Sequence, residues 1–212
     1  MKHFKVARLV VVKVNMILRN KMVEKEIASF LKESNDIEGH VFSIDDYVED
    51  SENPYIKGQI DAFNFIINHL RIAPISDIDN EIIFTLYELL TKNTPEVKEK
   101  NIKMWQYRDR NVQVGGRLCP EPFLATELMN NWILDFNSMK HDPLEIHYRF
   151  ELIHPMTDFN GRLGRDLLIY DLIRRGLPVK NMLDNFKGET FFEKRNNYYR
   201  AIDNFNNKNR QL

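Results

Sequence analysis

The chain has 212 residues, of which 43% are hydrophobic and 29% charged, a composition typical of a globular protein of about one domain. Its formal net charge is −1, so it lacks the basic excess that nucleic-acid binding usually needs, and we expect no nucleic-acid partner. The single cysteine, Cys119, excludes an intramolecular disulfide and agrees with a reducing compartment.

The first 18 residues contain the one stretch that could imitate a targeting signal. Lys13 interrupts its apolar run, and no small-residue cleavage site follows. The run is also far shorter than the ~20 residues that span a bilayer. We therefore expect a cytoplasmic protein without a membrane partner.

Apolar spacing predicts that most of the chain is helical. Val23, Ile27 and Leu31 recur at spacings of four, and Gly39 stands where that helix should stop. The same periodicity predicts three further helices, over residues 57–70, 79–90 and 121–136.

Residues 103–122 depart from this helical pattern. Two alternating apolar pairs flank the turn-like residues 108–111, namely Trp105 with Tyr107 and Val112 with Val114. Gly115 and Gly116 end the alternation. The pattern predicts a small β-hairpin over residues 105–116.

Two helices enclose the most charge-rich stretch, HPMTDFNGRLGR at residues 154–165. The sequence DPLE at residues 142–145 is a capping-box start for the first helix. That helix should end near His154, because a residue that precedes a proline is biased away from helical backbone. The second helix should close at Gly176, and its middle has so little polar face that we expect it to be central and buried.

The start of the second helix has the features of a polyphosphate site. The first N–H groups of a helix lack internal partners and carry the positive end of its dipole. Asn160 and Gly161 fall at that N-terminus, and Arg162 and Arg165, three residues apart, rise from the same side. Two guanidiniums beside a helix N-terminus favour an anionic ligand.

Two further groups in this stretch could act on such a ligand. Asp158 offers a hard oxygen of the kind that binds Mg²⁺ together with substrate phosphates. His154 can accept a proton near neutral pH, as a general base must. Singly, each of these residues is more often a cap, a turn or a surface ion pair, but their joint occurrence favours a nucleotide site.

The stretch resembles the signature of the Fic family, H-x-F-x-[DE]-G-N-G-R-x-x-R, and the preceding HYRFELIHP also looks like that family. The resemblance covers roughly residues 55–207. It implies a mainly α Fic fold, a helical bundle around a central buried helix with the predicted hairpin as a flap. We expect an N-terminal segment at 1–54 and a Fic core at 55–212, packed as one compact unit. The matching signature positions are His154, Asp158, Asn160, Gly161, Arg162 and Arg165.

The resemblance implies a protein adenylyltransferase, which moves AMP from ATP to a hydroxyl side chain of a target protein. His154 would be the catalytic base and Asp158 the Mg²⁺ ligand. The phosphates would be held by Asn160 and Gly161, by Arg162 at the α/β region and by Arg165 at the γ-phosphate. The target would dock on the 105–116 hairpin, and the pattern leaves a homodimer open.

Two positions depart from the signature. Met156 replaces a phenylalanine, an apolar exchange that should keep an anchor in the core. Phe159 replaces a glycine, and we expect it to resist both a positive φ and a close approach of backbone to phosphate. This keeps two alternatives open: a nucleotide-binding regulatory module with little transferase activity, and a Fic-fold enzyme that removes AMP or transfers another phosphate-containing group.

An inhibitory element is predicted upstream, in a helix at about residues 22–38. Ser34, Glu38 and Gly39 match the family's inhibitory motif [ST]-x-x-x-E-[GN]. Ser34 and Glu38 continue the apolar stripe of that helix, and a carboxylate at a helix C-terminus needs a cationic partner. The resemblance implies that this partner is Arg165, so that Glu38 keeps it from the γ-phosphate.

Three other residues, one histidine and two tyrosines, could contribute to the same site. His147 lies two helical turns before His154 without a third nitrogen or sulfur ligand nearby, so we interpret it as structural rather than as part of a zinc site. Tyr198 and Tyr199 could line a nucleotide pocket, although the core is the favoured location.

Overall fold

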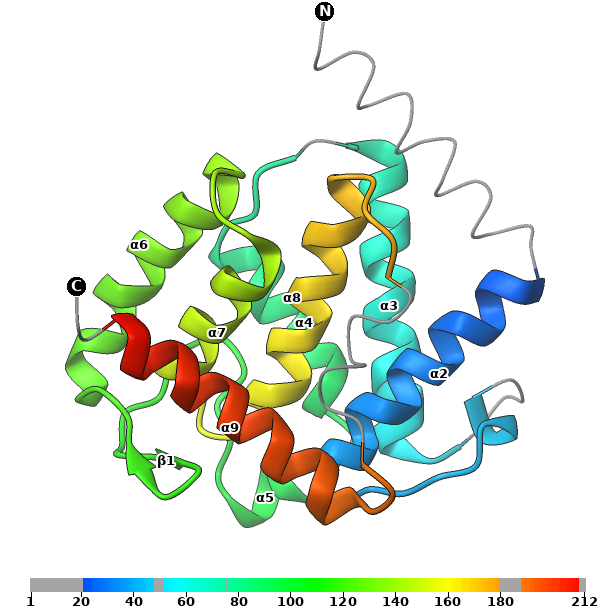
Figure 1. Ribbon diagram of the computed structural model, residues 1–212, viewed down its shortest axis with the longest axis horizontal. Helices are drawn as coiled ribbons and strands as arrows, with labels where there is room; N and C mark the ends of the chain where they lie inside the picture. Colours follow the sequence, from blue (N-terminus) through cyan, green and yellow to red (C-terminus); the bar gives the residue numbers. More distant parts are fainter. Residues whose placement is uncertain (1–20, 48–51, 75, 180–187, 210–212) are drawn as a thin grey trace, which may run out of the picture.

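The computed structural model describes residues 21–47, 52–74, 76–179 and 188–209, with side chains from residue 27 onward. The targeting-like stretch of residues 1–18 and the side chain of Val23 lie outside the described residues. In this part of the chain the protein is mainly helical (Figure 1). The helices are α2 (Lys21–Ile37), α3 (Pro54–Ile72), α4 (Asn80–Thr91), α5 (Glu96–Glu99), α6 (Ala125–Ser138), α7 (Pro143–Ile153), α8 (Asn160–Arg174) and α9 (Phe191–Asn209), with 3-10 turns at Asp45–Tyr47 and Pro122–Leu124.

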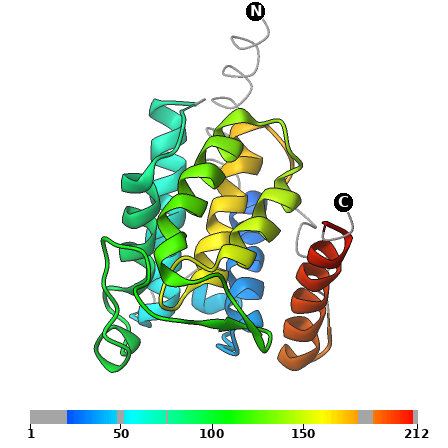
Figure 2. The ribbon, with the colours of Figure 1, turned by 90° about the vertical axis from the view of Figure 1, so that its left-hand side faces the viewer.

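Helix α8 is the centre of the bundle, as its sequence predicted. It packs against α7, α4, α3 and α2, and Figures 1 and 2 show it between these helices. Every side chain from Leu163 to Ile173 is buried. A helix without a solvent face is held by packing on all sides, so its N-terminus is a fixed point on which a site can be built.

The loop between α7 and α8 begins at His154 and ends at Phe159, and both residues have left-handed backbone. The Asp142 side chain caps the start of α7 by accepting from the backbone N–H groups of Leu144 and Glu145. At the other end His154 has φ 50°, and its N–H donates to the carbonyl of Phe150. Helix α7 thus ends just before Pro155, as predicted.

The β-hairpin was predicted with the wrong register. The strands are β1 (Gln113–Val114) and β2 (Arg117–Leu118), and Gly115 and Gly116 form the turn between them. Both glycines have positive φ, 56° and 80°, as the favoured two-residue hairpin turn requires. The predicted turn instead contains the buried Arg108, whose N–H donates to the carbonyl of Pro155 and whose Nε donates to that of His154.

Helix α2 brings the predicted inhibitory motif to the central helix. It packs against α3, α8 and α9, and the chain turns away at Gly39, where φ is 86°. Ile27 and Leu31 of the predicted stripe are buried. None of the helices in the described ranges combines the length and apolarity that a membrane span requires.

Candidate functional site

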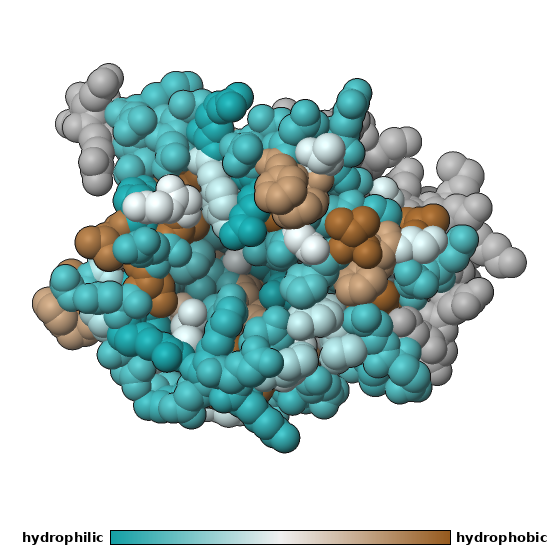
Figure 3. Space-filling model, turned by 90° about the horizontal axis from the view of Figure 1, so that it is seen from below, coloured by the Kyte–Doolittle hydropathy of each residue, from teal (hydrophilic) through white to brown (hydrophobic). Residues whose placement is uncertain are grey.

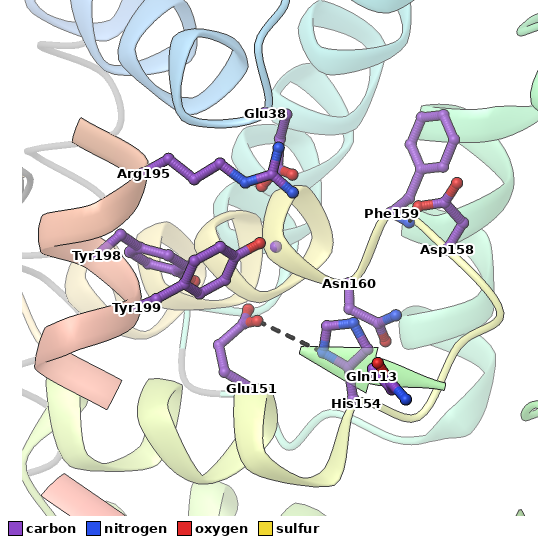
Figure 4. A pocket seen from close by; sticks show the side chains of 11 residues that line it. Glu38, Gln113, Glu151, His154, Asp158, Phe159, Asn160, Arg195, Tyr198 and Tyr199 are labelled. Carbon is purple, nitrogen blue, oxygen red and sulfur yellow. Dashed lines mark hydrogen bonds and ion pairs between the residues drawn. The ribbon is translucent and has the colours of Figure 1, made fainter. Parts of the chain in front are cut away.

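A pocket of about 140 Å³ lies where α7 ends and α8 begins (Figure 4). From the 154–159 loop and α8 it is lined by His154, Asp158, Phe159, Asn160 and Gly161, and from other elements by Glu38, Gln113, Glu151, Arg195, Tyr198 and Tyr199. Figure 3 views the molecule from below, the side on which β1 and the N-terminus of α8 lie in Figure 1. That face is mostly hydrophilic, with hydrophobic residues in separate groups.

His154 is held in a form that can accept a proton. Burial lowers its pKa to about 4, although the backbone carbonyl of Glu151 acts in the opposite direction. The imidazole is therefore neutral near pH 7. Its Nδ1 lies 3.8 Å from Oε2 of Glu151, and the imidazole faces the pocket. The backbone is fixed independently, because the His154 carbonyl accepts from Nε of Arg108 at 2.8 Å.

Asn160 fixes the shape of the loop. Its Nδ2 donates to the carbonyl of Met156 at 2.9 Å, and its Oδ1 accepts from the N–H of Met156 at 2.7 Å. Met156 itself is fully buried, as expected for an anchor in the core. Both ends of the Asn160 side-chain amide thus form hydrogen bonds within the loop, and the residue also borders the pocket.

Phe159 does adopt the backbone conformation that we expected it to resist. Its φ is 61° and its ψ 11°, and it precedes α8 as the N-cap residue. The side chain is only 3% exposed, and the centre of its ring lies 3.6 Å from the guanidinium carbon of Arg162. Burial and this cation–π contact therefore offset a backbone cost of ~1–2 kcal/mol. Figure 4 shows the ring pointing away from His154.

The two signature arginines lie outside the pocket lining. Arg162 is 5% exposed and stacks between the rings of Phe159 and Tyr55, with 5.5 Å to the Tyr55 centroid. Its Nε and Nη1 are buried and have no hydrogen-bond partner among the described residues. Because buried polar groups are normally paired, these two donors are available for a ligand.

Arg165, in contrast, is held by the predicted inhibitory motif. Its Nε donates to Oγ of Ser34 at 2.8 Å, and its Nη2 donates to the Ser34 carbonyl at 2.9 Å and to Oε1 of Glu38 at 2.6 Å. Burial acts to raise the pKa of Glu38, but the charges of Arg165 and Arg162 outweigh it and hold that pKa below its ordinary range. Both partners of this ion pair are therefore charged at neutral pH.

Glu38 lies directly against the N-terminus of α8. A Cβ added at Gly161 would come 2.3 Å from Oε1 of Glu38 and 3.0 Å from Nη1 of Arg165, so only glycine allows this approach. The carboxylate thus lies at the positive end of the α8 dipole, where an anionic ligand would bind. A negative group of the chain itself occupies the predicted phosphate position.

Asp158 provides a single carboxylate for a metal ion. It borders the pocket and is 28% exposed; Oδ1 accepts from the N–H of Phe159, and Oδ2 lies 2.5 Å from Nζ of Lys100. No group of three or more His, Cys, Asp or Glu side chains in the described ranges is arranged to hold a metal. The residue therefore fits Mg²⁺ that takes its remaining oxygens from phosphates and water, the usual arrangement at nucleotide sites.

Sequence reasoning did not identify three of the pocket residues. Arg195 extends from α9 toward Glu38 (Figure 4), lowers the pKa of that carboxyl, and lies 5.5 Å from the Tyr199 ring. Gln113 comes from β1, and Glu151 precedes His154 by three residues on α7. Its spacing could have identified Arg195: it precedes Tyr198 by three residues and Tyr199 by four, and residues at these spacings lie on the same face of a helix.

His147, Tyr198 and Tyr199 all lie close to the pocket or its supporting core. His147 is buried, with Nδ1 3.0 Å from the Gly164 carbonyl and Nε2 2.9 Å from the Tyr198 hydroxyl, which is the environment of a structural histidine. Tyr198 is 1% exposed yet borders the pocket, and Tyr199 borders it as well. Both tyrosines therefore pack in or against the core and also line the pocket.

Together, the bundle and its loop define a helical domain with a histidine beside the N-terminus of a buried helix. Residues 77–172 match the Fic/DOC family. The chain is 43% identical over 135 residues to the protein adenylyltransferase fic-1 of Caenorhabditis briggsae and 28% identical over 134 residues to that of Caenorhabditis elegans. Each alignment covers 60% of this chain and 25% of the relative, so the chain spans about a quarter of these curated relatives. The match to the Fic/DOC family therefore rests on residues 77–172, which form a Fic domain.

Solved structures share the fold. A Fic domain containing signaling protein from Bacteroides thetaiotaomicron matches with a TM-score of 0.63 and 19% identity, covering 93% of this chain and 80% of that one. A Fic family protein from Desulfovibrio desulfuricans matches with a TM-score of 0.66 and 14% identity, covering 98% and 66%. At these identities the likeness shows the architecture, a helical bundle with a small antiparallel sheet.

Proposed function

We propose that this chain transfers AMP from ATP to a hydroxyl side chain of a target protein, and that Glu38 restrains the reaction. One observation carries the proposal: the Glu38 carboxylate lies at the N-terminus of α8 and pairs with Arg165 at 2.6 Å. A helix N-terminus binds anions, so a carboxylate of the chain itself at this position can compete with the phosphates of a ligand. The relatives named protein adenylyltransferase support the reaction class.

In the proposed step His154 acts as the general base. Its neutral imidazole takes the proton of the acceptor hydroxyl, whose oxygen then bonds to the α-phosphorus of ATP. The bond from that phosphorus to the bridging oxygen of the β-phosphate breaks, and pyrophosphate leaves with the electron pair. Mg²⁺ held by Asp158 would neutralise phosphate charge, and Arg195 would add a cation on the opposite wall of the pocket.

The inhibitory contact acts on the end of the phosphate chain. In the described structure Arg165 directs Nε and Nη2 to Ser34 and Glu38. A γ-phosphate near Gly161 would meet the Glu38 carboxylate, and the like charges would repel each other. ATP can therefore bind with its terminal phosphate against Arg165 only when Glu38 has moved away.

We also propose that the target docks on the β1–β2 hairpin. Gln113 of β1 borders the pocket beside His154, and the edge of a strand can pair with an extended peptide through main-chain hydrogen bonds. A peptide added there would bring its hydroxyl to the His154 side of the pocket.

Covalent labelling tests the proposal. Purified wild type, Glu38→Gly and the double variant Glu38→Gly with His154→Ala are incubated with ATP labelled on the α-phosphate and with Mg²⁺. We expect Glu38→Gly to label itself more strongly than wild type, and loss of the base to reduce that labelling by ~10²- to 10⁴-fold. Labelling that is independent of His154 would refute the mechanism.

A second candidate function is a nucleotide-binding module without transfer activity. The observation that favours it is that Arg162 stacks on Phe159 and is not itself part of the pocket lining. Calorimetric binding of ATP to Glu38→Gly without any label, also when glycine is restored at position 159, would support the module. Release of AMP from an AMP-modified protein, assayed in parallel, would identify an enzyme that removes AMP by hydrolysis.

A further inference from the structure

A chain of buried polar groups leads from α8 to the proposed base. His147, Tyr198, Glu151 and His154 follow one another within contact distance, and the first three are at most 2% exposed. We propose that Glu151 is a positioning residue for His154: its ionised carboxylate stabilises the imidazolium that forms when His154 takes the substrate proton. This inference rests on the proposed transferase function.

Hydrogen-bond geometry fixes the proton positions along this chain. The Gly164 carbonyl only accepts, so Nδ1 of His147 carries a proton at 3.0 Å from it. Burial lowers the pKa of His147 to about 3, so the ring is neutral and Nε2 is an acceptor. The Tyr198 hydroxyl at 2.9 Å therefore donates to Nε2. The same hydroxyl also shares a hydrogen bond with Glu151, and that bond lowers the pKa of the Glu151 carboxyl and raises that of Tyr198.

The surroundings of Glu151 are consistent with a change of charge near neutral pH. Burial raises its pKa to about 7; Arg165 from α8 lowers it and Glu38 raises it again. His154 faces it from the end of α7, and Tyr198 from α9. Above pH 7 the carboxylate would be negative, and it would lie 3.8 Å from Nδ1 of His154, within ion-pair distance.

The sequence leaves space for this carboxyl group. A Cβ added at Gly164 would come 2.3 Å from Oε1 of Glu151 and 3.2 Å from Cε1 of His147. Oε1 of Glu151 is buried and has no hydrogen-bond partner among the described residues, and the residue borders the pocket. A buried carboxyl behind a histidine base orients the ring and stabilises its protonated form without having to take the proton itself.

The coupling predicts a pH profile that depends on Glu151. In the active Glu38→Gly background, the labelling rate should rise with pH as Glu151 ionises. Its midpoint should lie below the wild-type pKa of about 7, because the Glu38 charge that raises this pKa is gone. Adding Glu151→Gln, which keeps the shape but cannot ionise, should remove that rise and lower the rate at pH 8 by about tenfold or more. The matched control is Glu145→Gln, at the far end of the same helix, where the side chain is 37% exposed. A merely structural role would lower the rate at every pH without moving the midpoint.

A measurement without turnover separates this inference from the proposed function. The ring protons of His154 are followed by NMR from pH 5 to 9 in wild type and in Glu151→Gln. We expect a step near pH 7 in wild type that reports the charge of Glu151 and disappears in the variant. Persistence of the step in Glu151→Gln overturns the inference. If the step behaves as expected while Glu38→Gly never labels, the coupling stands and the proposed transferase function fails.

Discussion

Phe159 replaces the glycine of the signature, and its energetics can be separated with three substitutions. Phe159→Ala removes a ring that is 3% exposed, which costs ~3–5 kcal/mol of unfolding free energy. Phe159→Gly loses the same ring but relieves the left-handed backbone at φ 61°, worth ~1–2 kcal/mol. The net loss for glycine should therefore be about 1–4 kcal/mol, and the glycine variant should be more stable than the alanine variant.

Phe159→Leu isolates the contact with Arg162. Leucine keeps most of the buried volume but has no aromatic face for the guanidinium 3.6 Å away. We expect a loss of about 1–2 kcal/mol from cation–π contact and repacking. Urea denaturation measures all three variants. A glycine variant at least as stable as wild type would refute this account, because backbone strain would then outweigh the packing of the ring.

The remaining predictions concern the pocket wall and the buried acid. In the Glu38→Gly background, Arg195→Gln should weaken ATP binding by about tenfold or more in calorimetry, since a charge-assisted hydrogen bond is worth ~1.5–3 kcal/mol. Arg200→Gln, on the same helix but outside the pocket lining, should not weaken it. Glu151 has a folded pKa of about 7 against an ordinary 4.5, so its contribution to stability is complete below pH 4.5 and is lost as pH rises through 7. Relative to Glu151→Gln, wild type should therefore lose about 3 kcal/mol between pH 4.5 and 7.5 in urea denaturation; parallel curves would contradict the assigned pKa.

The parts of the fold that follow local rules could be predicted from the sequence. The helices carry apolar residues at helical spacing, and Asp142 and Pro155 delimit α7 by capping and by proline sterics. The ion pair of Glu38 and Arg165 joins residues 127 positions apart. Local rules could say only that Glu38 needs a cation; the family resemblance named which one.

The parts that were missed depend on competition between distant groups. Alternation around residues 108–111 resembled a hairpin, but the Gly115–Gly116 turn and the carbonyls that bind Arg108 determined the register. Likewise, steric preference argued against positive φ at Phe159, and the stacking of Arg162 on its ring was not visible in the sequence. At Phe159 a tertiary contact outweighed a local backbone preference of about 1–2 kcal/mol.

The opposite states of the two signature arginines indicate where the inhibitory contact acts. Arg165 makes three hydrogen bonds to the end of α2 and the turn after it. Arg162, in contrast, keeps Nε and Nη1 buried and without a hydrogen-bond partner in the part of the chain that the structure describes. An anion that reached Arg162 would satisfy donors that the resting fold leaves unsatisfied, but one that reached Arg165 would first have to displace Glu38. We therefore expect Glu38 to disfavour a terminal phosphate more strongly than the rest of a nucleotide, so that Glu38→Gly improves binding of ATP more than binding of AMP. Equal gains for the two nucleotides in calorimetry would show that Glu38 blocks the whole pocket instead.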